Sequence, residues 1–285
     1  MDKPEIMVSI CCITYNQQKY IAEALDGFLM QQANFKYEII IGDDCSTDGT
    51  KAVVEAYRQK YPDKIKVLNH DSNIGSIKNQ IKTFKISKGK YVAMCDGDDY
   101  WTDPLKLQKQ IDFLERNPQY VICCHYTRVI DDTGELVYEN SSPVTLEFDY
   151  EDILVGKKDE TRVCSIVFKN IPEIQNIGLE NWYYTTFGAD TFLKLYATAN
   201  TNEKIYVLPE VMGVYRLHKD GVYSMIDGRV RKRKMINDFN ILINNFSYSA
   251  HYKKELLKIY ITQYFLFDIR NYNFQKALNT IITLV

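Results

Sequence analysis

Four short strand-like segments alternate with amphipathic helical segments over the first 115 residues of the chain. The strand-like segments are runs of apolar and small residues, as is typical of strands buried on both faces, and they span 7–13, 37–42, 65–68 and 91–95. The helices between them begin near Lys19, Thr50 and Ile77, and Thr50 can cap the second of these helices. Alternation of this kind predicts an α/β protein with a doubly wound, mostly parallel sheet.

The pattern changes after Asn117. We expect strands at 120–130, 136–138, 163–168 and 205–216, with a hairpin turn at 131–134 and a helix at 190–199. From about Gly228 the chain becomes helical and aromatic-rich, and the basic run 229–234 opens this tail. The predicted organisation is a body at 1–225, with halves at 1–117 and 118–225, and a helical C-terminal extension at 226–285.

Composition excludes several classes of protein. A chain with 46% hydrophobic and 25% charged residues can bury a core, and a net charge of -2 argues against a nucleic-acid partner. The seven cysteines show no CxxC spacing, which favours buried reduced thiols in a cytosolic protein. The first seven residues lack the shape of a signal peptide, and no apolar run approaches the ~18 residues of a membrane span. We therefore expect a cytoplasmic protein, soluble or peripheral on the inner face of the membrane.

Polar residues follow three of the four predicted strands. They are Thr14-Tyr15-Asn16, Asp43-Asp44 and the stretch from Asp96 to Asp99. Ligands of open α/β sheets bind outside the carboxyl ends of the strands, so these residues predict a binding site.

The stretch Asp96-Gly97-Asp98-Asp99 places three carboxylates around a glycine. Hard divalent cations such as Mn²⁺ and Mg²⁺ prefer oxygen ligands, often one or two carboxylates with phosphates completing the shell. The alternative is an ordinary solvated turn, since Asp-Gly pairs are common turn formers.

Asp44 also has two interpretations. Its carboxylate can accept a hydrogen bond from a ring N–H of a nucleobase, and Tyr15 at the neighbouring strand end can stack on the base. Alternatively, Asp43, Asp44 and Asp48 only shape the turn, which is the role that we assign to Asp48 and to Ser46.

Five motifs in order resemble the inverting glycosyltransferase family 2, of the type that builds bacterial surface polysaccharides. They are VSICCITYN, YEIIIGDDCSTDGT, DSNIGSIKN, SKGKYVAMCDGDDYW and DPLKLQKQ. The resemblance covers about residues 7–115 and extends more thinly to 224. It implies a Rossmann-like GT-A catalytic domain at 1–225, whose first half binds the nucleotide-sugar and whose second half binds the acceptor. It also implies a nucleotide-diphospho-sugar donor, a UDP-sugar above others, and Mn²⁺ or Mg²⁺ as cofactor.

The resemblance assigns roles to residues of this chain. Thr14, Tyr15 and Asn16 would form the base pocket with Asp44, Lys78 would lie near the base or diphosphate, and Asp96 would contact the ribose. Asp98 would bind the metal, with Asp99 behind it. The stretch Tyr215-Arg216-Leu217-His218, followed by Gly221-Val222-Tyr223-Ser224, resembles a C-terminal motif that closes over the diphosphate, so Arg216 would offset phosphate charge and His218 would reach the metal.

The family's catalytic base lies in a Glu-Asp pair at a helix start, which here corresponds to Ala189-Asp190. Asp190 is therefore the expected general base, although Ala189 replaces the usual Glu; the alternative is that Asp190 only caps its helix. Trp101 and Trp182 are candidates for the acceptor region or for core packing. The other histidines, at positions 70, 125 and 251, are interpreted as structural.

These assignments imply an inverting transfer of a sugar to a hydroxyl of a glycan or lipid-linked acceptor, with Asp190 taking the proton. Two other functions stay open. A sugar nucleotidyltransferase would show a glycine-rich, basic loop after the first strand, which Thr14-Tyr15-Asn16-Gln17-Gln18 is not. A non-catalytic nucleotide- or sugar-binding subunit is favoured only by Ala189.

The tail at 226–285 has two interpretations. Its basic run and aromatic helix would suit a peripheral contact with an anionic membrane, or the helix packs on the catalytic domain or on a second subunit, which we favour. The apolar end Ile281–Val285 suggests that the natural chain continues.

Overall fold

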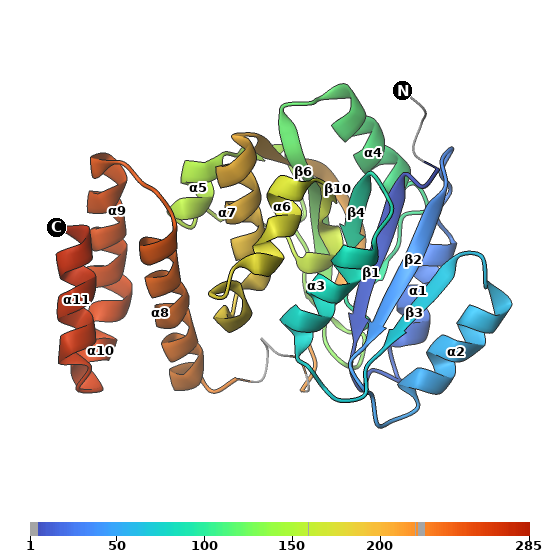
Figure 1. The fold of residues 1–285 in the computed structure, drawn as a ribbon, viewed down its shortest axis with the longest axis horizontal. Helices are drawn as coiled ribbons and strands as arrows, with labels where there is room; N and C mark the ends of the chain where they lie inside the picture. The colour runs from blue at the N-terminus through green and yellow to red at the C-terminus, as the bar shows by residue number, and fades with distance from the viewer. Residues whose placement is uncertain (1–4, 159, 220, 222–225) are drawn as a thin grey trace.

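A ten-stranded, mixed and mostly parallel sheet forms the centre of the computed structural model, which describes residues 5–158, 160–219, 221 and 226–285 (Figure 1). The strands are β1 (Val8–Thr14), β2 (Tyr37–Asp43), β3 (Ile65–Asn69), β4 (Tyr91–Met94), β5 (Tyr100–Trp101), β6 (Tyr120–Ile130), β7 (Leu136–Tyr138), β8 (Leu146–Phe148), β9 (Val167–Lys169) and β10 (Lys204–Arg216). Their order is β3-β2-β1-β4-β9-β6-β10-β5, with β7 beside β6 and β8 beside β10.

Helices cover both faces of this sheet and form the tail. They are α1 (Ile21–Leu29), α2 (Thr50–Lys60), α3 (Ser76–Ile86), α4 (Lys106–Arg116), α5 (Tyr150–Leu154), α6 (Pro172–Gln175), α7 (Ala189–Thr201), α8 (Gly228–Asn245), α9 (Ala250–Tyr260), α10 (Leu266–Arg270) and α11 (Phe274–Leu284). Short 3₁₀ turns η1 (Val163–Ser165), η2 (Asn176–Leu179) and η3 (Tyr183–Thr185) lie between them, and η4 (Ile261–Phe265) is a π-helical turn.

The first half of the chain has the predicted parallel arrangement. β1 pairs in parallel with both β2 and β4, and β2 pairs in parallel with β3. Alternate residues of β1 face opposite sides: Ile10 and Cys12 join the core beneath α1 and α4, whereas Cys11 joins the core on the α3 side. Both faces are thus buried, which explains why the strand sequences show no polar alternation.

The helix after β2 begins differently from the prediction. Thr50 is the first residue of α2 rather than its cap, and its hydroxyl donates to Asp48 Oδ1 at 2.5 Å. Asp48 Oδ1 also accepts from the Thr50 N–H, at 2.9 Å, so the carboxylate of Asp48 caps the helix. Asp48 and Ser46, whose hydroxyl accepts from the Asn16 N–H, therefore have the turn-shaping roles that we expected.

The second half carries antiparallel strands among parallel ones. β6 and β10 are parallel to each other, and the antiparallel β9 lies between β4 and β6. The predicted strand at 163–168 is wrong in its first half, because 163–165 forms η1 and only β9 pairs. All seven cysteines are free thiols, and six of them are buried.

The tail packs on the body through α8, as the packing interpretation predicts. In Figure 1, α8 stands beside α5 and α7, and α9, α10 and α11 lie on its far side. Phe246, which ends α8, contacts Trp182 and Phe192 of the body, with ring centroids 5.3 and 6.1 Å apart. Among the described residues, no helix combines the length and the apolar character that crossing a membrane requires. The proposed division at residue 225 stays a prediction.

Candidate active site

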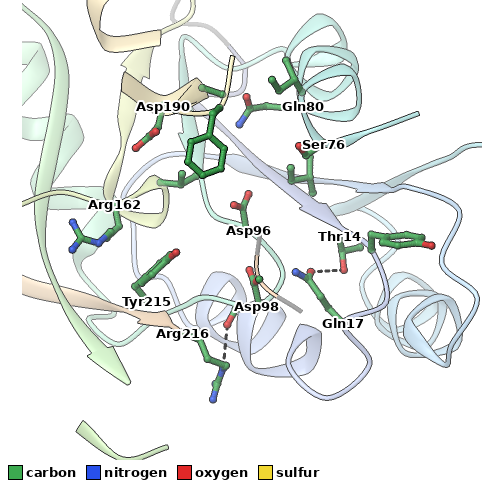
Figure 2. A pocket seen from close by; sticks show the side chains of 18 of the residues that line it. Thr14, Gln17, Ser76, Gln80, Asp96, Asp98, Arg162, Asp190, Tyr215 and Arg216 are labelled. Atoms are coloured by element: carbon green, nitrogen blue, oxygen red, sulfur yellow. Dashed lines mark hydrogen bonds between the residues drawn. The ribbon is translucent and has the colours of Figure 1, made fainter. Parts of the chain in front are cut away.

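A cavity of about 830 Å³ opens at the carboxyl ends of β1, β2 and β4 (Figure 2). The three polar strand ends meet there because the strands are adjacent: the Asp44 N–H donates to the Thr14 carbonyl at 2.9 Å, and the Gly97 N–H donates to the Ile13 carbonyl at 2.9 Å. Gly97 leaves no room for a side chain, since a Cβ atom would lie 2.6 Å from Gln17 Oε1 and 2.9 Å from Thr14 Oγ1. The loop from Asp96 to Asp98 is therefore held tightly against β1.

The acidic loop after β4 is tied to the end of β10. His218 Nε2 lies 2.9 Å from Asp98 Oδ2, and the Arg216 N–H donates to Asp99 Oδ1 at 2.9 Å. The Arg216 Nε–H donates to the Asp98 carbonyl at 3.2 Å. Asp96 and Asp98 line the cavity, whereas Asp99 is buried behind them, as the sequence predicts.

Negative charge is concentrated on this side of the cavity. Burial, together with the nearby charges of Asp98 and Asp190, raises the pKa of Asp96 to about 8. Burial also raises the pKa of Asp99 well above its ordinary value. Carboxylates that disfavour one another's ionisation form a site that a cation stabilises.

The donor set fits a divalent metal ion. Asp98 offers a carboxylate oxygen and His218 an imidazole nitrogen, both of which bind Mn²⁺, while Mg²⁺ relies more on oxygen. Within the described residues, no group of three or more His, Cys, Asp or Glu side chains is placed to hold an ion. Asp98 and His218 would fill part of a coordination shell, and the phosphates of a substrate could supply other ligands.

The β1 and β2 side of the cavity carries the residues predicted for the nucleotide. Thr14, Tyr15 and Asp44 line it, and the ring of Tyr15 is 45% exposed and free to stack. Asp44 already accepts two backbone hydrogen bonds, from the Ile74 N–H at 2.7 Å and the Gly75 N–H at 2.9 Å. A carboxylate has about four acceptor positions, so Asp44 can shape this loop and still accept from a ligand.

Two residues predicted for the nucleotide do not line the cavity. Lys78 is exposed on α3, whose neighbouring residues Ile77 and Asn79 line the cavity in its place. Asn16 has a left-handed backbone with φ 54°, and its Oδ1 accepts from the Thr47 N–H at 2.7 Å. Asn16 therefore shapes the turn after β1, which corrects the expectation.

Asp190 lies on the opposite wall, in the first turn of α7. Figure 2 shows its carboxylate directed into the cavity that also holds Asp96 and Asp98. Gly188, not Asp190, is the cap residue of this helix, so the capping alternative is wrong. The N–H groups of Phe187 and Gly188 donate instead to Asp238 of α8, at 2.9 and 2.8 Å.

Two arginines, Arg216 and Arg162, line the cavity. Arg216 lines it as predicted, and its guanidinium also pairs with Glu23 at 2.7 Å. Arg162, which the sequence analysis did not identify, lines the cavity with its guanidinium 5.7 Å from the Tyr215 ring centroid. No strand end or motif marks Arg162 in the sequence, because the fold alone brings its loop to the site.

The two tryptophans lie outside the cavity lining. Trp101 is 1% exposed, contacts Phe28 and donates its indole N–H to the Cys164 carbonyl at 2.7 Å. A sugar cannot reach this ring, so its acceptor role is wrong and its packing role is confirmed. Trp182 is half-buried against Phe192 and Phe246, at the contact between body and tail.

The other three histidines do not line the cavity, and each contacts a neighbouring residue of the fold. His125 is buried, and burial lowers its pKa to about 3 while Nδ1 contacts the Tyr126 carbonyl. His70 contacts Asn79, and His251 lies against Tyr252 in α9. Of the C-terminal motif, Val222, Tyr223 and Ser224 lie outside the described residues.

The sequence is similar to known proteins over most of its length. The family model described as glycosyl transferase family 2 matches residues 9–173. A Mycobacterium tuberculosis relative, the uncharacterized protein Rv1520, is 36% identical over 76% of this chain and 60% of its own length. TuaG of Bacillus subtilis, a protein named for teichuronic acid biosynthesis, is 28% identical over 69% of this chain and 81% of its own. The chain thus spans about 60% of the mycobacterial relative that it matches.

Solved structures share the fold at low sequence identity. S. aureus TarS 1–349 in complex with UDP-GlcNAc has a TM-score of 0.68 and 20% identity over 96% of this chain and 79% of its own. The mannosyltransferase PcManGT from Pyrobaculum calidifontis, in complex with GDP-Man and Mn²⁺, has a TM-score of 0.65 and 17% identity over 96% and 74% of the two chains. The family model covers more than half of the residues and the architecture agrees, so this chain belongs to glycosyl transferase family 2 and has the GT-A fold.

Proposed function

We propose that this chain transfers a sugar from a nucleotide-diphospho-sugar to a hydroxyl of a glycan or lipid-linked acceptor, with inversion at the anomeric carbon. The observation that carries the proposal is that the acidic loop at 96–98 and Asp190 face one cavity from opposite walls (Figure 2). Family membership supports it, and so do the UDP-GlcNAc and GDP-Man held by two proteins of the same fold.

The donor would lie along the carboxyl ends of β1 and β2. Tyr15 is exposed beside Asp44, so a base can stack on the ring while the carboxylate accepts its N–H group. Arg216 and Arg162 would offset the charge of the diphosphate between this pocket and Asp190. A UDP-sugar is our first expectation for the donor.

Asp98 and His218 would hold a divalent cation, Mn²⁺ or Mg²⁺, at the diphosphate. When bound, such a cation stabilises the charge that develops on the leaving nucleoside diphosphate. Asp98 is oriented for this role by its contact with His218, at 2.9 Å, and by the backbone hydrogen bond from Arg216 to Asp99 behind it.

Asp190 would act as the general base. Its carboxylate would take the proton of the acceptor hydroxyl as the oxygen attacks the anomeric carbon on the face opposite the diphosphate. The glycosidic bond forms as the bond between the anomeric carbon and the phosphate oxygen breaks, so one displacement inverts the configuration. The observation that supports this role is that Asp190 lines the same cavity as Asp96 and Asp98.

The test combines donor binding with transfer. We expect one of UDP, GDP, CDP and dTDP, given with Mn²⁺, to raise the thermal stability of the wild type, by about 2.7 kcal/mol at 100 times its dissociation constant. Asp98→Asn should lose this metal-dependent response. Asp190→Asn should keep it and transfer sugar about 10²–10⁴ times more slowly, since a general base contributes a factor of that size.

Asp63→Asn provides the matched control, because Asp63 is an exposed acid in the turn before β3 and far from the lining residues. It should behave as the wild type in both measurements. If Asp190→Asn transfers sugar at the wild-type rate, the assigned base is wrong. If no nucleotide stabilises the protein under any metal condition, a non-catalytic subunit becomes the better explanation.

A further inference from the structure

A second hollow lies beside the active-site cavity, between the end of η3 and helix α8. Its volume is about 250 Å³, and it is lined by residues 185–187 of the body and by Val230, Arg233, Lys234 and Asn237 of α8. The four helix residues follow the spacing i, i+3, i+4 and i+7, so they share one face of α8. The Asn237 side chain donates to the Thr185 carbonyl at 3.2 Å, which joins the two walls.

This hollow is positively charged. Arg233 and Lys234 are both exposed at its rim, and neither forms an ion pair with a carboxylate of the described residues. Lys234 Nζ lies 5.0 Å from the centroid of the Phe187 ring, so its ammonium group is placed over a residue that lines the hollow. Asp238 lies close enough to Lys234 for their charges to interact, and its carboxylate accepts from the N–H groups of Phe187 and Gly188. Two cations around a concave surface form a site for an anionic group.

The hollow and the active-site cavity share one lining residue. Phe187 lines both the hollow and the main cavity, and Asp190 follows it by three residues. The acidic loop that would hold the donor diphosphate lies on the opposite wall. The hollow therefore adjoins the part of the cavity that Asp190 lines, where the proposed acceptor hydroxyl would lie.

We propose that Arg233, Lys234 and Asn237 bind an anionic group, a phosphate or a carboxylate, that the acceptor carries beside its reacting hydroxyl. This inference rests on the proposed function, because it concerns the acceptor of that same reaction. The anion would come from an acidic glycan repeat or from the phosphate of a lipid-linked acceptor, and both present the same chemistry. The cationic tail helix would thus select acidic acceptors, which gives the basic run a role that the donor site does not use.

The test uses the whole chain and a double variant, Arg233→Gln with Lys234→Gln. Lys254→Gln with Lys258→Gln is the matched control, because these exposed lysines lie on α9 and lose the same charge. Binding is measured by calorimetry, without divalent metal, to a glycerol phosphate hexamer, to an oligomer of glucuronate, to uncharged maltohexaose and to vesicles of phosphatidylglycerol and phosphatidylcholine. UDP, GDP, CDP and dTDP are then titrated with Mn²⁺ to read the donor site separately.

We expect the wild type and the α9 control to bind an acidic oligomer and not maltohexaose. The Arg233 and Lys234 double variant should bind that oligomer about tenfold or more weakly, since each hydrogen bond to a charged group contributes about 1.5–3 kcal/mol. A preference for the phosphate or the glucuronate oligomer identifies the source of the anion. Nucleotide binding should be equal in all three proteins.

Three results would overturn the inference. The first is that the wild type binds neither acidic oligomer. The second is that the α9 control loses as much affinity for the oligomer as the Arg233 and Lys234 double variant. The third is that the protein binds only the vesicles, which would make α8 a membrane contact. None of these results touches the donor site. Conversely, if no nucleotide binds to any of the three proteins while the acidic oligomer responds as expected, the proposed transfer fails and the anion site stands.

Discussion

The carboxylates of the cavity bear on the cation that we propose for the donor site. Asp96 is surrounded closely enough by Asp98 and Asp190 that its pKa rises to about 8, with burial as the main cause. A nucleoside diphosphate would add further negative charge to the same space. Arg216 offsets part of it but is already paired with Glu23. A divalent ion at Asp98 and His218, as proposed, would offset this added charge.

Glu38 shows how a buried carboxylate is stabilised away from the site. It is 3% exposed on β2, and its carboxylate accepts from the Ser9 hydroxyl at 2.7 Å, the Lys88 N–H at 2.9 Å and Lys66 Nζ at 2.5 Å. Burial alone would raise the pKa of Glu38, but these hydrogen bonds outweigh it, and the pKa lies below its ordinary value. The ionised form therefore joins β2 to β1, β3 and the loop after α3.

The lowered pKa of Glu38 predicts how stability depends on pH. A carboxyl group whose pKa is lower in the folded state contributes stability above its unfolded pKa, and this contribution is lost as the pH falls through the folded value. Glu38→Gln should lower the free energy of unfolding by about 1–3 kcal/mol at pH 7, because it leaves buried donors unsatisfied. Urea unfolding at pH 7 and below pH 4 measures this. The exposed Glu135→Gln serves as the control; equal losses at both pH values in Glu38→Gln would contradict the explanation.

Sequence patterns predicted the elements well where local and tertiary preferences agree. β6 and β7 have the predicted bounds, and β1–β4 differ from the prediction by one residue at their ends. The strand prediction failed at 163–165, because these residues form η1 and are buried by the fold around it, where the Cys164 carbonyl accepts from the Trp101 indole, whereas Val167 and Phe168 pair within β9. The contact that holds the start of α7 could not be predicted, since the acceptor of the Gly188 N–H is Asp238, which lies 50 positions later in the chain.

Helix α8 holds the start of α7 in place through Asp238. Its carboxylate accepts from the N–H groups of Phe187 and Gly188 at 2.9 and 2.8 Å, where α7 has no capping side chain of its own. Burial raises the pKa of Asp238, and the two backbone hydrogen bonds partly oppose this. The start of α7, the helix that carries Asp190, therefore depends on a contact from the tail.

Removing this contact should affect both stability and the proposed transfer. Asp238→Ala is expected to lower the free energy of unfolding by about 1–3 kcal/mol, because it leaves two backbone N–H groups without their acceptor. It should also lower kcat while leaving KM for the donor unchanged, because the donor pocket lies on the other wall. Asp238→Asn, whose carbonyl can still accept one hydrogen bond, should restore part of both losses. A fall in donor affinity equal to the fall in kcat would contradict this role.

The positions of the site residues could be predicted where they follow strand ends. Thr14, Asp44 and Asp96 were found in this way, because adjacent parallel strands bring their carboxyl ends together. Arg162 and the hollow at α8 could not be found, since both depend on how loops and the tail fold back on the sheet. Lys78 and Asn16 were misplaced for a related reason: neighbouring residues along a helix or turn point in different directions.

Body and tail share one of the two hydrophobic cores. The core on the α3 and α7 side includes Phe168 and Phe192 of the body together with Phe239 and Tyr260 of the tail, whereas Trp101 lies in the core beneath α1 and α4. Phe239 is 7% exposed and stacks on Tyr260 with ring centroids 5.7 Å apart. The two cores lie on opposite faces of one sheet, and the same strands contribute side chains to both. We therefore expect the chain to unfold as one cooperative unit.

Phe239→Ala in a Trp182→Phe background tests this expectation, since Trp101 then reports alone on the core farthest from the tail. The substitution should lower the free energy of unfolding by about 3–5 kcal/mol, the range for deleting a buried phenylalanine. The fluorescence of Trp101 and the far-ultraviolet circular dichroism should shift to the same new midpoint in urea. Phe274→Ala, which removes a ring that is 54% exposed on α11, should leave the midpoint nearly unchanged. An unshifted Trp101 transition alongside an earlier loss of helical signal would instead mean that residues 226–285 fold as a separate unit.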